Sequence, residues 1–112
     1  WQEAEASACA WLRDMGFRDA KLTQHGQDGG IDIVARKVVA QVKWVAAPVG
    51  RPKLQQLHGA ASKVRKQGAF FSRRGYTQEA RTWAEEAGMA AFVLTEDGSL
   101  APITSAARKM MR

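Results

Sequence analysis

The chain has 112 residues, about the size of one domain, so any function must fit on a single small scaffold. Hydrophobic residues make up 46% and charged residues 25% of the sequence, a balance that is typical of a folded protein and excludes a disordered chain. Lys and Arg number 17 against 11 Asp and Glu, and the resulting formal charge of +6 favours polyanionic partners, of which nucleic acid is the commonest. Simple solubility charge is the alternative explanation of this surplus.

The cellular setting is indicated by cysteine usage and hydropathy. The single cysteine, Cys9, cannot form an intramolecular disulfide or a cysteine zinc cluster, so we expect a reducing, cytoplasmic environment and a buried structural role for this residue. No apolar run approaches the roughly 20 residues that span a bilayer, and we expect no membrane contact from this segment. Because the sequence begins at Trp1, we expect residues 1–112 to be a single domain taken from a longer chain.

The first half of the chain predicts one helix and a three-stranded meander. Apolar residues at helical spacing predict a helix over 2–15 that is closed by Gly16, and a short strand follows at 21–24. β-Branched residues dominate 31–42 except at 35–37, a pattern that predicts an antiparallel hairpin.

The second half of the chain predicts two further strands and three helices. In chain order we first expect a helix over 54–64 that ends near Gly68 and a strand over 68–72. A helix between the cap Thr77 and Gly88 follows, and then a strand over 89–94. A turn at 96–98 leads into a last helix over 99–112, despite Pro102. This order predicts one α/β domain in which helices cover a mixed central sheet.

Three polar side chains of the predicted hairpin converge if its turn lies at Arg36 and Lys37. Asp32 then lies directly opposite Gln41, and directly opposed residues point to the same side of a sheet. Lys43, two residues beyond Gln41, shares that side. A two-residue type I′ turn prefers Asn-Gly, and a slip of one residue would turn one strand's side chains to the other face, so the convergence depends on this turn.

A carboxylate beside an amide oxygen offers hard oxygen ligands that suit Mg²⁺, for which we expect Mn²⁺ to substitute. A lysine beside such an ion can orient or deprotonate a water and stabilise charge on a phosphate, which suits phosphodiester hydrolysis. Taken singly, Asp32 is better explained as a turn residue and Lys43 as a solvated strand end. Their combination with Gln41 in a basic chain favours the metal-site interpretation.

The segments GGID at 29–32 and QVK at 41–43 resemble the motifs of the PD-(D/E)xK nuclease superfamily. They are most similar to the Mrr-type catalytic domain, in which Gln often replaces Glu. The segments AEASACAWLRDMGF, LQQLHGAA and RRGYTQEARTWAEEAG resemble the same family, so the resemblance covers nearly the whole chain. It implies a restriction-endonuclease-like fold with the element order α-β-β-β-α-β-α-β-α, and a metal-dependent DNA endonuclease activity.

The resemblance also implies roles for individual residues. Asp32 matches the family's metal-binding aspartate, Gln41 its variable acidic or amide ligand, and Lys43 its catalytic lysine. Glu5 matches a helix glutamate that supports the metal or its waters, and the main-chain carbonyl of Val42 is expected to add a ligand. The helix dipole also explains a glutamate in a first helical turn, which leaves the role of Glu5 open.

A set of basic residues could neutralise DNA phosphates on either side of the site, although a solvated helix face explains them equally well. The set is Arg51, Lys53, Lys63, Lys66, Arg73 and Arg74. We expect double-stranded DNA as the partner, with homodimerisation or flanking segments supplying sequence specificity.

Two other functions remain open on the sequence. One is a DNA-binding module with little or no hydrolytic activity, because Gln41 carries no charge and should hold Mg²⁺ more weakly than a glutamate would. The other is a protein-interaction module that uses the basic face.

Several other polar and aromatic residues are expected to have structural roles. Asp28 precedes two glycines and is expected to form a turn. His25 and His58 have no other zinc ligands at the usual spacing. Trp44 is expected to pack in the core.

Overall fold

The structure is a computed structural model, and it describes residues 2–24 and 30–112. The turn expected at Asp28 and the histidine His25 lie outside the described residues. No helix in the described part is long and apolar enough to cross a membrane. The elements follow one another as α1 (Gln2–Asp14), β1 (Lys21–Leu22), β2 (Ile33–Val34), β3 (Val38–Lys43), α2 (Arg51–Lys63), β4 (Gln67–Ser72), α3 (Gln78–Ala87), β5 (Ala90–Leu94), β6 (Leu100–Pro102) and α4 (Ser105–Met110).

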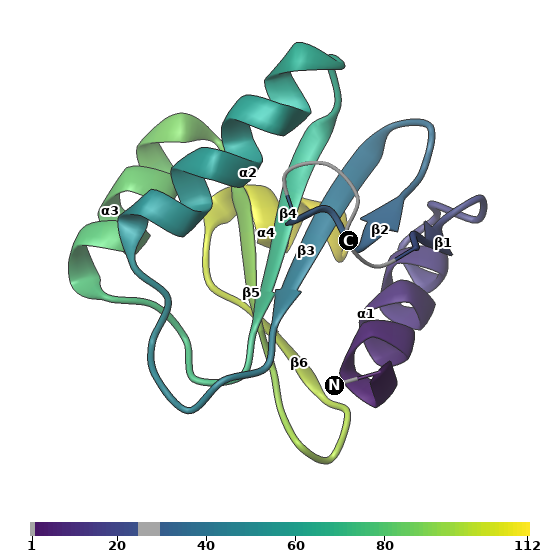
Figure 1. Cartoon of the computed structure of the whole chain (residues 1–112), viewed down its shortest axis with the longest axis horizontal. Coiled ribbons are helices and arrows are strands. Elements are labelled where there is room, and N and C mark those ends of the chain that lie inside the picture. Colours follow the sequence, from purple (N-terminus) through teal and green to yellow (C-terminus); the bar gives the residue numbers. More distant parts are fainter. Residues whose placement is uncertain (1, 25–29) are drawn as a thin grey trace.

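The strands form one six-stranded sheet in the order β1-β2-β3-β4-β5-β6. The first three strands are antiparallel, as the predicted meander requires, whereas β3, β4 and β5 run parallel and β6 returns antiparallel to β5. Helices α2 and α3 cover one face of the sheet, and α1 and α4 cover the other (Figure 1). The predicted α/β fold, with a mixed central sheet between helices, is confirmed.

The carboxyl ends of β3, β4 and β5 meet at one end of the molecule because these strands are parallel. Helix α2 follows β3, so its first turn lies near this end and its last turn near the opposite end. The first turns of α1 and the turn between β5 and β6 lie at the same end, in the lower part of Figure 1. Several segments that are distant in the sequence are thereby gathered around the carboxyl end of β3.

Strand β3 separates two hydrophobic cores. Its residues Ala40 and Val42 pack in the core formed with α1 and α4, whereas Val39 packs in the core formed with α2 and α3. Because strand side chains alternate between the two faces of a sheet, Gln41 and Lys43 are on the same face as Val39.

Residues with expected structural roles lie in these cores or beside them. Cys9 is buried on α1, and this burial raises the pKa of its thiol. Trp44 packs against the core on the α1 side, which confirms the packing prediction, and the guanidinium of Arg73 lies over its ring at 5.5 Å from the ring centroid. His58 makes an edge-to-face contact with Trp83, with the ring centroids 5.4 Å apart.

The prediction of a helix over 99–112 is wrong in its first half. The turn expected at 96–98 is present, but it leads into the edge strand β6, which pairs with β5. Pro102 has no main-chain N–H to donate to a hydrogen bond. An edge strand tolerates this missing donor, and a helix interior does not. Helix α4 starts only after Thr104, whose side-chain oxygen caps it. The observed order therefore contains one strand more than the predicted order.

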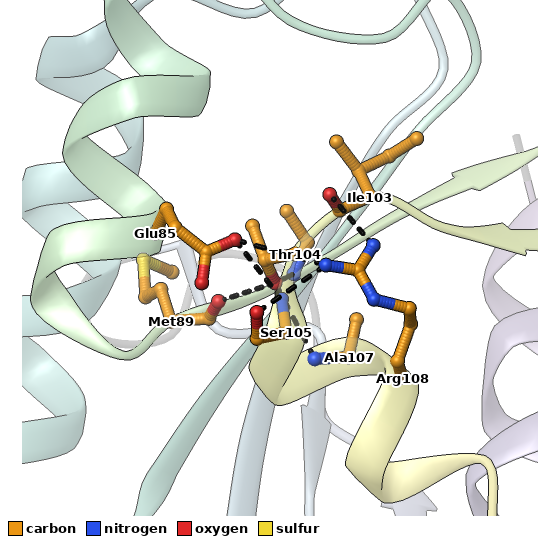
Figure 2. A network of polar contacts seen from close by, with 8 residues as sticks. Glu85, Met89, Ile103, Thr104, Ser105, Ala107 and Arg108 are labelled. Carbon is orange, nitrogen blue, oxygen red and sulfur yellow. Dashed lines mark hydrogen bonds and ion pairs between the residues drawn. The ribbon is translucent and has the colours of Figure 1, made fainter.

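Thr104 joins α4 to β5 through its buried hydroxyl (Figure 2). The hydroxyl donates a hydrogen bond to the Met89 carbonyl at 2.7 Å. Its oxygen accepts hydrogen bonds from the amides of Ala91 at 3.1 Å and Ala107 at 3.3 Å. One side chain therefore satisfies three buried main-chain groups at the edge of the sheet. Figure 2 also shows the neighbouring contacts among Glu85, Ser105 and Arg108.

We predict that Thr104→Val lowers the free energy of unfolding by about 1–3 kcal/mol, because it leaves buried main-chain groups without a partner. Urea denaturation followed by circular dichroism measures this loss. Thr82→Val is the matched control, since Thr82 is exposed on α3 and its loss should leave stability almost unchanged. Equal losses in both variants would contradict the role assigned to Thr104.

Candidate active site

The β2–β3 hairpin has the register that the Arg36-Lys37 turn predicts. Ile33 pairs with Ala40 and Val34 with Val39. The amide of Ala35 donates to the Val38 carbonyl at 2.8 Å and closes the turn. The two residues between them, Arg36 and Lys37, are therefore the turn residues.

The turn is held by contacts from outside the hairpin. Neither Arg36 nor Lys37 has a positive φ, so this is not the type I′ turn that two-residue hairpins prefer. The carboxylate of Asp19 accepts a hydrogen bond from the Arg36 amide at 2.6 Å. The ammonium of Lys66 donates to the Ala35 carbonyl at 2.7 Å. Two residues distant in the sequence thus stabilise a turn that its own sequence does not favour.

The regular ladder ends at Ile33, one residue short of Asp32. The amide of Asp32 donates to the Ala40 carbonyl at 2.8 Å, so Asp32 and Ile33 both lie against Ala40, as in a β-bulge. The expectation that Asp32 lies directly opposite Gln41 in a regular ladder is therefore wrong. Bulges redirect a side chain, and here the carboxylate of Asp32 turns toward the main chain of β3.

Asp32 is anchored at its carboxylate and its carbonyl. Its Oδ2 accepts a hydrogen bond from the Val42 amide at 2.8 Å. Its carbonyl accepts one from the Thr23 amide at 2.9 Å, while the Thr23 hydroxyl donates to the Ile31 carbonyl at 2.7 Å. Thr23 thus positions the strand that carries Asp32. Its role was missed in the sequence, where the only signal is a polar residue at the end of a short strand.

The main-chain carbonyl of Val42 points toward the same neighbour as the Val42 amide. In an antiparallel ladder the amide and carbonyl of one residue face the same adjacent strand. Because the Val42 amide binds the Asp32 carboxylate, the Val42 carbonyl is directed to the Asp32 side of β3. This orientation is the one that a carbonyl ligand next to Asp32 requires.

Gln41 is 7% exposed, and its Oε1 is buried and accepts no hydrogen bond from any described residue. A buried amide oxygen without a partner is costly, so an additional ligand would stabilise it. Gly30 packs directly on this amide: with a φ of 74°, a Cβ built on it would lie 2.9 Å from Gln41 Nε2. The glycine before Ile31 and Asp32 therefore leaves space for the Gln41 side chain.

Lys43 and Glu5 are carried by different elements, β3 and α1. Lys43 is the half-buried last residue of β3 and is on the same face as Gln41. Glu5 is 4% exposed on the inner side of α1, whereas Glu3 is exposed. Helix α1 covers the opposite face of β3, so a role for Glu5 requires its carboxylate to reach the sheet edge beside Asp32. This assignment stays a prediction.

The groups at this site that could coordinate a cation are oxygen atoms of the kind that hard cations prefer. Among residues 2–24 and 30–112, no three His, Cys, Asp and Glu side chains are grouped closely enough to hold a metal. A cation here would instead be held by the Asp32 carboxylate, the Gln41 amide oxygen and the Val42 carbonyl. These donors fit Mg²⁺ or Mn²⁺, which accept one or two carboxylates and retain water, better than zinc.

The basic residues predicted to bind DNA are divided between two ends of the molecule. Arg51 and Lys53 begin α2, and Arg73 and Arg74 follow β4, so these four lie at the carboxyl end of β3 with Lys43. Lys63 and Lys66 lie at the opposite end of α2.

Three of the six have partners among the described residues. Arg51 pairs with Glu79 at 3.5 Å, and Arg73 pairs with Glu96. Lys66 holds the hairpin turn through the Ala35 carbonyl. The set is therefore not one uniform solvated face.

Comparison with known proteins identifies related sequences. A model of the restriction endonuclease family matches residues 1–101. The type IV methyl-directed restriction enzyme EcoKMrr of Escherichia coli (strain K12) is 41% identical over 66 residues, which is 52% of this chain and 22% of the relative. The chain therefore spans about one fifth of the length of this relative. No solved structure matches the chain.

We predict that Gly30→Ala displaces the Gln41 amide and lowers the free energy of unfolding by about 1–2 kcal/mol, because alanine is strained at positive φ. The side-chain amide signals of Gln41 in an NMR spectrum report the displacement, and urea denaturation reports the loss. Gly59→Ala is the matched control: Gly59 lies in α2 with nothing near its Cβ position, so alanine should stabilise by about 0.5–1 kcal/mol. Unchanged Gln41 signals in Gly30→Ala would contradict the packing described here.

Proposed function

Because this chain belongs to the restriction endonuclease family, we propose that it is the catalytic domain of a metal-dependent DNA endonuclease. The observation that carries the proposal is the buried Oε1 of Gln41, which accepts no hydrogen bond from any described residue and belongs to the residue before Val42, whose amide binds the Asp32 carboxylate. Family membership supports a nuclease function, and the relative from Escherichia coli is itself named as a restriction enzyme.

Three oxygen atoms of this chain are proposed to hold Mg²⁺, with Mn²⁺ as a substitute: a carboxylate oxygen of Asp32, Oε1 of Gln41 and the carbonyl oxygen of Val42. When bound, the ion would polarise the scissile phosphate and stabilise the charge that develops on it. Thr23 and Gly30 hold these donors in place, through the hydrogen bonds at the Asp32 strand and through packing on the Gln41 amide.

Lys43 is proposed to orient the attacking water and to accept or share its proton. Its position at the carboxyl end of β3 places it on the same side as Gln41 and near four of the basic residues at that end. Glu5 is proposed to orient water at the sheet edge beside Asp32. The DNA backbone would cross this end of the molecule, where Arg51, Lys53 and Arg74 can neutralise phosphates.

Double-stranded DNA is the proposed substrate, and cutting both of its strands calls for two active sites or two successive events. A homodimer would supply two sites. A DNA-binding module without hydrolysis is the second candidate, and the neutral side chain of Gln41 favours it because an amide binds Mg²⁺ more weakly than a carboxylate does.

We predict that Asp32→Asn and Lys43→Met each lower Mg²⁺-dependent nicking of supercoiled plasmid by about 100-fold or more, because each removes a group that acts on the reacting phosphate or water. Gel electrophoresis of the plasmid products over time measures the rates. The control Asp14→Asn changes an exposed aspartate at the end of α1 and should cleave as the unmodified protein does.

Cleavage that persists unchanged in both variants would refute the assignment of these residues. Salt-dependent DNA binding without cleavage in the unmodified protein would instead support the binding module.

We predict that Lys53→Gln weakens binding to a short DNA duplex and reduces the slope of log K against log salt by about 1, because Lys53 contacts a phosphate at the end that carries Lys43. Lys63→Gln removes the same charge from the far end of the same helix and should leave the slope unchanged. Fluorescence anisotropy at several salt concentrations measures both. Equal slopes for the two variants would contradict the proposed path of the DNA.

A further inference from the structure

A cavity of about 350 Å³ opens next to the candidate active site, and of its lining residues only Arg73 belongs to the set predicted to bind DNA. It lies between the first turns of α1, the ends of β3 and β4, and the turn between β5 and β6. The lining side chains that matter for its chemistry are Glu3, Ser7, Trp44, Arg73, Thr95 and Glu96.

The cavity is directly connected to Lys43 through the main chain. Trp44 is the next residue along the chain, about 3.3 Å further in an extended strand. The amide of Arg73 donates to the Lys43 carbonyl at 3.2 Å. Ligands of sheets with parallel strands bind outside the carboxyl ends of those strands, and the cavity occupies this position for β3, β4 and β5.

The charges around the cavity exclude a phosphate as its occupant. One guanidinium, from Arg73, faces two carboxylates, from Glu3 and Glu96, so the lining has a net negative charge. Ser7 and Thr95 add hydroxyl groups that can donate or accept. Such a lining suits an uncharged polar molecule that carries both donors and acceptors.

Arg73 presents a flat surface inside this lining. Its guanidinium lies over the Trp44 ring, and its ion pair with Glu96 holds it there. Its Nε is buried and donates to no described residue. Nucleic-acid bases stack on arginine planes and on aromatic rings, and carboxylates accept hydrogen bonds from their exocyclic amino groups.

We propose that this cavity binds a single unstacked nucleobase of the DNA strand whose phosphate lies at Lys43. The base would stack on the guanidinium of Arg73 and donate from an amino group to Glu96 or Glu3. The cavity is in the size range of small-ligand pockets. The proposal rests on the proposed function, and it assigns to the domain a contact with a base as well as with the backbone.

Base unstacking in short DNA duplexes tests the proposal. Each duplex carries one mispaired 2-aminopurine, scanned through successive positions, because a mispaired base leaves the stack at the lowest cost. Fluorescence is measured at saturating protein in EDTA, so that metal-dependent cleavage does not occur. We expect a several-fold rise in fluorescence for at least one position with the unmodified protein.

Two variants and a matched control assign that rise to the cavity. Arg73→Gln removes the stacking plane, and Ser7→Leu fills the cavity from α1 without changing the sheet; both should abolish the rise at saturation. Arg74→Gln removes the same charge from the adjacent, exposed residue and should weaken binding while leaving the rise at saturation intact. Circular dichroism confirms that each variant is folded.

No rise at any position with the unmodified protein would overturn the proposal, as would an unchanged rise in both Arg73→Gln and Ser7→Leu. Plasmid cleavage in Mg²⁺ is measured separately. Cleavage without a rise would refute the base-binding cavity and leave the proposed nuclease intact. A rise without cleavage would support the cavity and refute the nuclease.

Discussion

The register of the β2–β3 hairpin is the constraint on which the candidate site depends. It places Asp32 beside Val42 and, two residues apart on one face, Gln41 and Lys43. A shift of one residue would turn the side chains of one strand to the opposite face of the sheet. The turn itself does not set this register by local preference, because neither of its residues adopts a positive φ. The Asp19 carboxylate and the Lys66 ammonium hold it from two other parts of the chain.

The bulge at Asp32 changes how the site is formed. A regular ladder would bring Asp32 and Gln41 together as opposed side chains on one face. The structure instead directs the Asp32 carboxylate toward the main chain of β3, where it accepts a hydrogen bond from the Val42 amide. Gln41 is on the face of β3 that packs against α2 and α3, where Gly30 leaves room for its amide. The three proposed donors therefore depend on a bulge at Asp32 and on the close approach of the Gly30 backbone to Gln41.

The two ends of the molecule carry different groups of side chains. At the carboxyl ends of the parallel strands lie the oxygen donors, Lys43, several basic side chains and the cavity around Arg73. At the opposite end, Lys66 has a structural role in the hairpin turn. The surplus of positive charge in the composition is therefore divided between surfaces with different contacts. A count of charges could not distinguish these surfaces, because it contains no information about where each charged side chain lies.

The sequence by itself predicted the first three helices, the antiparallel meander and the hairpin turn at 36–37. It also singled out Asp32, Gln41 and Lys43, whose roles stay predictions. These features depend on local periodicity, on turn and cap residues, and on spacing within one hairpin. It missed β6, since a short strand that ends in Pro102 has almost no local pattern and forms only by pairing with β5. The tertiary structure alone decided the bulge, the positioning by Thr23, the burial of Glu5 rather than Glu3, and the cavity beside Trp44. Each of these arises from contacts between segments far apart in the chain, whose geometry local sequence patterns do not specify.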